Sequence, residues 1–298
     1  MKKILLALLF VTGAVQAQQI ITVVWPFGMG DTQAQYSRSL IEELNNTQKK
    51  YLFVLENKPG AGATIGAKYV ASTPNTVLAA STAFFVRPNL YPEESHRPAD
   101  FRPLMTQCAA PMVIVSKRYK SWRDIDNQQL INIGVSGLGA TSHLMAMEIR
   151  KRYPNAIPVP YKGTREASID AANGNLDMSV AFLGEVEGFL DDGKLYALGI
   201  SGPKRVKGIP TLESQGFVGV KEVVNMHSLI VPKTMPESQY NELRKLVVEA
   251  AMARGVQTAY RVDYCEPSEF NYSQTNAWFS RQIAMWKRLS QGVNLENK

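Results

Sequence analysis

The sequence predicts an α/β protein in which short buried strands alternate with helices. Two observations support this class. Short apolar runs rich in β-branched residues recur along the chain, and helical stretches separate them. Uninterrupted apolar runs are typical of strands that are covered on both faces. We therefore expect mainly parallel, buried strands.

The predicted elements follow one another in a regular order. Strands are expected at residues 20–24, 53–55, 77–80, 112–115, 132–135, 157–160, 178–182, 197–201 and 229–231. Helices are expected at residues 32–45, 63–71, 142–152 and 165–172, and two longer ones at 237–254 and 268–290. The alternation places most helices directly after a strand.

The N-terminus has the pattern of an export signal. Lys2 and Lys3 precede the apolar segment 4–11, and residues 15–17 offer small side chains at the usual cleavage positions. The apolar segment is too short to span a bilayer. We expect a Sec-type signal peptide at 1–17, cleavage before Gln18, and a mature protein in the periplasm of a Gram-negative cell. An uncleaved membrane anchor is the alternative.

The composition and net charge limit which classes of protein and which binding partners are possible. The chain has 298 residues, of which 45% are hydrophobic and 20% charged, so it is not largely disordered. Its net charge of +7 becomes +5 (7 − 2) once Lys2 and Lys3 are removed. The basic residues are scattered and not interleaved with aromatic ones, which argues against a nucleic-acid partner. The mild positive electrostatic field of the mature protein favours the binding of anionic small molecules.

The cysteines and histidines are few. Cys108 and Cys265 can form at most one disulfide, and the sequence leaves open whether they do. His96, His143 and His227 lie far apart without metal-ligand spacing, so we expect no metal site and no cofactor.

Three strand-to-helix junctions share one design. Each has an apolar strand, a short turn rich in Gly, Ser or Thr, and then a helix, at 24–32, 135–142 and 160–164. Ligands of open α/β sheets bind at such carboxyl ends, where helix N-termini present N–H groups. Two facing turns would hold a carboxylate or phosphate. The alternative is that these residues only satisfy turn geometry and helix capping.

Several longer motifs carry a family resemblance. They are "IITVVWPFGMGDTQAQYSR" from Ile20, "LENKPGAGATIGAKYVA" from Leu55, "VSGLGATSHL" from Val135 and "VPYKG" from Val159. Their order and content resemble the periplasmic solute receptors of the tripartite tricarboxylate transporter family, the Bug or TctC-like proteins. The resemblance covers essentially the whole mature chain.

The resemblance implies a type II periplasmic-binding-protein fold, with two α/β domains joined by a two-strand hinge around a ligand cleft. Domain 1 would comprise 18–111 plus 231–298, and domain 2 would comprise 112–230. The function implied is capture of a small organic acid for the membrane permease subunits of such a transporter. The protein is expected to be a monomer.

The candidate site combines backbone N–H groups and hydroxyls with apolar walls. Gly28 and Gly30 let the backbone approach a ligand, while Thr32 and Ser142 cap helices or face a carboxylate. Phe84 and Phe85 are further candidates for the apolar walls. The ligand-binding candidates are Trp25, Phe27, Gly28, Met29, Gly30, Asp31, Thr32, Gln33, Ser81, Thr82, Ala83, Gly137, Gly139, Ala140, Thr141, Ser142, Tyr161, Lys162, Phe182 and Met226.

The sequence departs from the family pattern at several places, among them Met226, where an aromatic residue is common, and Pro74-Asn75-Thr76, where the family has D-G-Y-T. Asp31 stands where the family has a glycine, and Ala34 and Ala181 stand where it has aspartates. An acid in the first loop should weaken capture of a carboxylate, unless Asp31 is an exposed cap. The alternative function is therefore a divergent receptor that acts in sensing or binds another ligand.

An enzyme is not expected. Ser142 and His143 are adjacent in sequence, which is poor geometry for a nucleophile and its base, and the chain has no GxSxG motif.

Overall fold

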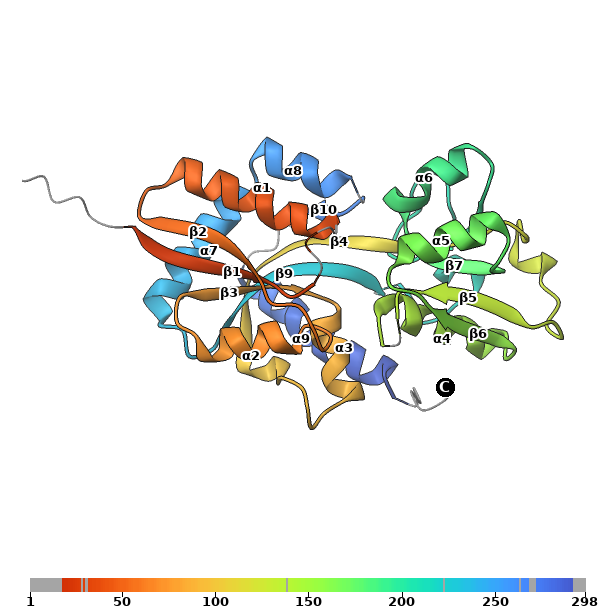
Figure 1. The fold of residues 1–298 in the computed structure, drawn as a ribbon, viewed down its shortest axis with the longest axis horizontal. Coiled ribbons are helices and arrows are strands. Elements are labelled where there is room, and N and C mark those ends of the chain that lie inside the picture. Colours follow the sequence, from red (N-terminus) through yellow and green to blue (C-terminus); the bar gives the residue numbers. More distant parts are fainter. Residues whose placement is uncertain are drawn as a thin grey trace, which may run out of the picture.

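The structure is a computed structural model that describes residues 18–27, 29, 32–137, 139–221, 223–262, 264–267 and 272–291. Two α/β lobes lie side by side along the long axis of the molecule, and two long strands, β4 (Phe101–Ser116) and β9 (Val224–Pro232), lie between them (Figure 1). No helix of the described residues is long and apolar enough to cross a membrane.

The first lobe is built from both ends of the chain. Its N-terminal elements are β1 (Gln19–Trp25), α1 (Thr32–Thr47), β2 (Tyr51–Asn57), α2 (Thr64–Ser72), β3 (Thr76–Ser81) and α3 (Ala83–Leu90). Its C-terminal elements are α7 (Glu237–Ala251), α8 (Arg254–Arg261), β10 (Glu266–Pro267) and α9 (Tyr272–Leu289). β1 pairs in parallel with β2 and β3, and β9 pairs antiparallel with β3 and β4.

The second lobe is built from the middle of the chain. Its elements are β5 (Ile131–Val135), α4 (Thr141–Arg152), β6 (Ala156–Pro160), α5 (Thr164–Asn173), β7 (Met178–Phe182), α6 (Leu183–Asp191) and β8 (Tyr196–Ile200). β5 pairs in parallel with β6 and β7. β7 and β8 both pair antiparallel with the end of β4.

Strand β4 belongs to both lobes. Up to Pro111, which lies opposite Val224, it pairs with β9, and from Met112, opposite Phe182, it pairs with β7. Pro111 has no N–H to donate, so it suits a point where the ladder changes partner. The short helices Pro98–Asp100, Trp122–Asp124 and Glu213–Gln215 lie in the connections.

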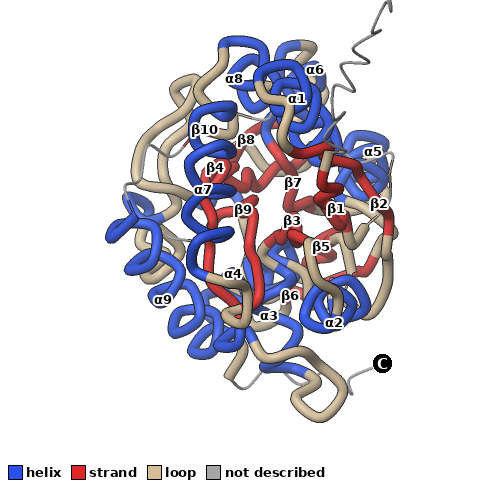
Figure 2. The backbone as a smooth tube through the Cα atoms, turned by 90° about the vertical axis from the view of Figure 1, so that its left-hand side faces the viewer, coloured by secondary structure: helices blue, strands red, loops and turns tan. Residues whose placement is uncertain are grey.

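Helices cover both faces of the first lobe's sheet, as the end-on view in Figure 2 shows. Successive side chains of a strand point to opposite faces. Ile21 and Val23 of β1 accordingly pack in one apolar cluster with α1 and α7, while Val24 packs in another with α2 and α3. Cys108 of β4 and Cys265 form a disulfide with a Cα–Cα distance of 5.3 Å, which settles the question the sequence left open.

Every predicted strand is present, but three predictions need correction. The parallel arrangement holds only for the outer strands, because all pairs of β4 and β9 are antiparallel. The predicted helix 237–254 is α7, which ends at Ala251, and a helix that was not predicted, α8, follows after Ala253 in an extended conformation. β4 begins at Phe101 rather than near residue 112.

Besides α8, two further helices were not predicted from the sequence, α3 and α6. α3 carries Pro88 in its interior, which weakened the helical pattern. α6 starts directly at the end of β7, with Phe182 at its N-cap, so no turn residue marked its beginning. Of the predicted helix 268–290, residues 268–271 lie outside the described part.

Candidate functional site

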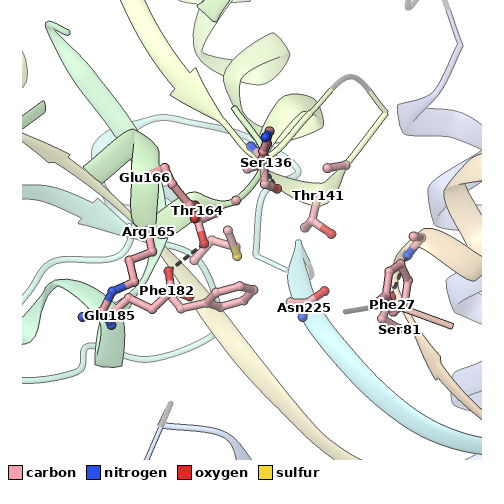
Figure 3. A pocket seen from close by; sticks show the side chains of 16 residues that line it. Phe27, Ser81, Ser136, Thr141, Thr164, Arg165, Glu166, Phe182, Glu185 and Asn225 are labelled. Atoms are coloured by element: carbon pink, nitrogen blue, oxygen red, sulfur yellow. Dashed lines mark hydrogen bonds between the residues drawn. The ribbon is translucent and has the colours of Figure 1, made fainter. Parts of the chain in front are cut away.

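A cavity of about 430 Å³ lies between the two lobes. In Figure 3, Phe27 and Ser81 lie on one side of it and Thr164, Arg165 and Glu185 on the other, with Ser136, Thr141 and Asn225 between them. The described lining residues are Phe27, Ser81, Ala83, Met112, Ser136, Ala140, Thr141, Ser142, Lys162, Gly163, Thr164, Arg165, Glu166, Phe182, Glu185 and Asn225.

The first-lobe wall comes from the carboxyl ends of β1 and β3. Phe27 follows β1 and packs edge-on against Trp25, with ring centroids 5.3 Å apart. The amide of Asn57 donates to the carbonyls of Trp25 (2.9 Å) and Phe27 (2.6 Å) and so fixes this loop. Asn57 belongs to the "ENKPG" motif, which therefore has a positioning role next to the cavity. Ser81 accepts a hydrogen bond from the Ala83 N–H at 3.4 Å.

Asn225 of β9 forms part of the floor where the strands cross. Its Nδ2 lies 3.1 Å from Nε2 of His227, and both residues are buried. Burial lowers the pKa of His227 to about 3, so this imidazole is neutral at physiological pH. The neutral ring packs against Tyr36, with centroids 5.3 Å apart, and holds the Asn225 amide in place.

The loop before α4 is shaped by its own hydroxyls. The Ser136 N–H donates to Oγ of Ser142 at 2.9 Å, and the two hydroxyl oxygens are 2.8 Å apart. Gly137 and Gly139 have φ of 107° and 78°, a region that favours glycine. α4 then begins with Thr141, Ser142 and His143, and its first turn carries no acidic residue in the described helix. Its N-terminal N–H groups and positive dipole end are suited to an anion.

The far wall comes from the starts of α5 and α6. The hydroxyl of Thr164 donates to Oε2 of Glu185 at 2.6 Å and joins the two helices. Phe182, between β7 and α6, adds a half-buried aromatic ring. Lys162 and Arg165 are exposed at the same wall.

The structure brings eight predicted residues to the cavity: Phe27, Ser81, Ala83, Ala140, Thr141, Ser142, Lys162 and Phe182. Gly28, Gly30 and Asp31 lie outside the described residues, and Thr32 and Gln33 are described only as the start of α1.

Nine other predicted residues are not among the described lining residues. Trp25 and Met226 are buried in two different core clusters, and Phe84 and Phe85 pack with Phe279. Thr82 is buried, and its hydroxyl donates to the Val224 carbonyl. Tyr161 donates to Asp170 at 2.6 Å, and this bond raises the pKa of Tyr161 to about 12. Met29 lies in the loop after β1, and Gly137 and Gly139 lie in the loop before α4. None of the three lines the cavity.

Sequence reasoning missed the lining residues Met112, Ser136, Gly163, Thr164, Arg165, Glu166, Glu185 and Asn225. Thr164 had a signal, since it closes the third of the strand-to-helix junctions. Among the described residues, no group of three or more His, Cys, Asp or Glu side chains is placed to hold a metal ion.

Two α/β lobes, two crossing strands and a ligand-sized cavity between them define a two-domain binding protein of the periplasmic type II class. The family model for the tripartite tricarboxylate transporter family receptor, TctC, matches residues 38–295. The chain therefore belongs to this family of solute-binding receptors.

Individual relatives agree with this assignment. The chain is 27% identical over 287 residues to the UPF0065 protein in the tcbD-tcbE intergenic region of Pseudomonas sp. (strain P51), covering 85% of each chain. The solved periplasmic binding protein BugD is 25% identical, with a TM-score of 0.77 and coverage of 92% of this chain and 97% of BugD. An R. palustris protein solved with adipate is 23% identical, with a TM-score of 0.78 and coverage of 93% and 97%. These structures confirm the two-domain fold.

Proposed function

We propose that the cavity captures a small organic carboxylate. The observation that carries this proposal is that the Ser136–Ser142 loop at the start of α4 lines the same cavity as Ser81 and Ala83 at the start of α3. Hydroxyls and helix N–H groups hold a carboxylate without a buried countercharge. The adipate in the R. palustris relative supports the same ligand class.

The receptor would deliver its ligand, as a monomer, to the membrane permease subunits of a tripartite transporter. It would be exported to the Gram-negative periplasm by the signal peptide at 1–17, which lies outside the described residues.

We propose that domain 1 comprises 18–111 plus 231–298 and that domain 2 comprises 112–230. The partner change at Pro111 and Met112 supports the first boundary. The pairing of β9 with β3 and β4 favours a second boundary near Val224 rather than at 230.

We expect no catalytic activity. Nδ1 of His143 accepts a hydrogen bond from the Gly139 N–H at 3.1 Å, and Oγ of Ser142 is held by Ser136. Neither group is arranged to activate the other.

Calorimetry on the mature chain, freed of bound ligand by unfolding and refolding, tests the proposal. We expect at least one small carboxylate to bind in the micromolar range or tighter. Ser142→Ala should weaken its binding by about ten-fold, because the loop loses the acceptor for the Ser136 N–H. Ser214→Ala, on the exposed helix Glu213–Gln215, is the matched control. Failure of mono-, di- and tricarboxylates and aromatic acids alike would refute the proposal.

A further inference from the structure

Strand β2 forms the outer edge of the first lobe's sheet (Figure 2). Among the described strands it pairs only with β1, in parallel. The Gln19 N–H donates to the Lys50 carbonyl, and the Lys58 N–H donates to the Trp25 carbonyl. The even-numbered residues of β2 therefore turn their backbone groups towards β1, and the odd-numbered residues turn theirs outward. Another chain can pair with such an outward row.

The outward groups of Phe53 are bound by a side chain of α1. Oδ1 of Asn45 accepts the Phe53 N–H at 2.9 Å, and Nδ2 of Asn45 donates to the Phe53 carbonyl at 2.9 Å. Asn45 lies in the last turn of α1. Its amide has both a donor and an acceptor, so one side chain takes the place that a neighbouring strand would fill.

The outward groups of Tyr51 are bound in the same way by Gln48, the residue after α1 and its C-terminal Thr47. Oε1 of Gln48 accepts the Tyr51 N–H at 2.8 Å, and Nε2 donates to the Tyr51 carbonyl at 2.8 Å. Nε2 also donates to the Leu44 carbonyl at 3.2 Å, which ties this amide to the helix. Two successive outward positions of the edge are thus closed by side-chain amides.

The face beside this edge suits a second copy of the chain. Ile20 of β1 and Leu52 and Val54 of β2 are exposed. Ile20 is paired with Leu52, and alternate residues of a strand share a face, so the three side chains lie together. In an antiparallel β2–β2 pair centred on Phe53, Leu52 would lie opposite Val54 of the other copy, and such cross-strand apolar pairs are stabilising.

The charges on β2 favour the same register. With Phe53 opposite its own copy, the outward groups of the odd-numbered residues form the hydrogen bonds. Lys50 then lies opposite Glu56 of the other copy at both ends of the pair, and opposite charges in these positions attract. Lys50 and Glu56 form ion pairs at the surface, with Glu242 and Lys58 respectively, so both are placed outside the core.

We propose that the amides of Asn45 and Gln48 block the edge of β2 and keep two copies of the chain from joining there. The N–H groups of Tyr51 and Phe53 are already used, so a second β2 cannot accept them without displacing both amides. Loss of the amides leaves the outward groups, the apolar face and the complementary charges free to act together. The block depends on β2 and α1 alone and is independent of what the cavity binds.

Analytical ultracentrifugation of the mature chain tests this block. The Asn45→Ala, Gln48→Ala double variant should form dimers at concentrations about ten-fold or more below any at which the wild type does. The matched control is the Gln35→Ala, Asn46→Ala double variant, which removes the same two residue types from exposed positions of α1. The control should sediment as the wild type does.

Val54→Lys identifies the surface. Added to the Asn45→Ala, Gln48→Ala variant, it places a charge in the apolar contact and should restore the sedimentation of the wild type. Circular dichroism shows whether each variant folds. Asn45→Ala alone keeps the Gln48 amide and should associate to an intermediate degree, and it decides the question if the double variant does not fold.

Three results would overturn the proposal. The first is a folded variant without the Asn45 amide that sediments like the wild type or like the control. The second is a dimer that Val54→Lys leaves intact, because it would form through another surface. The third is a wild type whose mass falls on Val54→Lys, because its β2 edge would already be paired.

Discussion

The hydroxyl of Tyr264 donates a 2.6 Å hydrogen bond to Oε1 of Glu187 and so connects the two lobes outside the crossing strands. Tyr264 lies between α8 and β10 in the first lobe, and Glu187 lies on α6 in the second. Lys207 binds the same carboxylate. These two donors lower the pKa of Glu187, the lysine having the larger effect. Tyr264 is thus held against the second lobe by a charged acceptor.

Tyr264→Phe should favour a more open arrangement of the lobes. The ring and its packing remain, while a hydrogen bond to a charged group, worth about 1.5 kcal/mol or more, is lost. Since the ligand binds between the lobes, its affinity should fall by up to about ten-fold. Calorimetry gives the affinity, and small-angle scattering without ligand gives the radius of gyration. Unchanged values of both would show that this contact does not bias the lobes.

The neighbouring residue, Cys265, predicts a redox effect on stability. Its disulfide with Cys108 closes a sequence separation of 157 residues and ties the Tyr264 segment to β4. Removing such a bridge costs about 2–5 kcal/mol of the free energy of unfolding. We expect the Cys108→Ala, Cys265→Ala double variant to unfold at lower urea concentration. Alanine is preferred to serine because both sites are buried.

The control for the disulfide is a reductant. Dithiothreitol should lower the urea midpoint of the wild type towards that of the double variant and leave the variant unchanged. A wild type that is insensitive to full reduction would show that the bridge contributes little to stability.

The parts of the fold that depend on local pattern could be predicted from the sequence. The strands and the helices after β1, β2, β5 and β6 are confirmed because their apolar periodicity is a local signal. The crossing of β4 and β9 is a tertiary arrangement, so nothing in the local sequence pattern predicts that Met112 and Asn225 line the same cavity. Glu185 was missed for a different reason: α6 follows β7 without a turn residue.

His96 predicts an acid-sensitive stability. Its ring is stacked on Phe84 with centroids 4.4 Å apart, its Nε2 bonds the Phe84 carbonyl at 2.8 Å, and burial lowers its pKa to about 4. Between pH 6.5 and 4 the unfolded chain binds a proton at this site and the folded protein does not. The free energy of unfolding therefore falls as the pH is lowered through this range.

His96→Gln removes this proton linkage. Between pH 7 and 4.5, the free energy of unfolding of the variant should change less than that of the wild type, by on the order of 2 kcal/mol. Urea unfolding at the two pH values measures both differences. His227, whose pKa is lowered to about 3, remains in the variant and should keep part of the acid sensitivity. Equal changes in the two proteins would show that His96 titrates alike in the folded and unfolded states.

Gly139→Ala tests whether the loop before α4 needs its close contact with the other lobe. Gly139 has φ of 78°, and a Cβ there would lie 2.7 Å from Cδ1 of Leu90 at the end of α3. The left-handed backbone alone costs an alanine about 1–2 kcal/mol. The contact with Leu90 should in addition displace the loop that carries Ser136 and Ser142, so we expect ligand affinity to fall by about ten-fold or more.

Gly193→Ala is the matched control, because Gly193 has φ of 66° and a Cβ there would have no heavy atom within 4 Å. It should lose similar stability on urea unfolding while keeping the wild-type affinity. Leu90→Ala combined with Gly139→Ala should recover part of the lost affinity, since the shortened side chain leaves room for the new methyl group. If Gly139→Ala binds ligand as well as Gly193→Ala does, the approach of Leu90 to this loop is not required for binding.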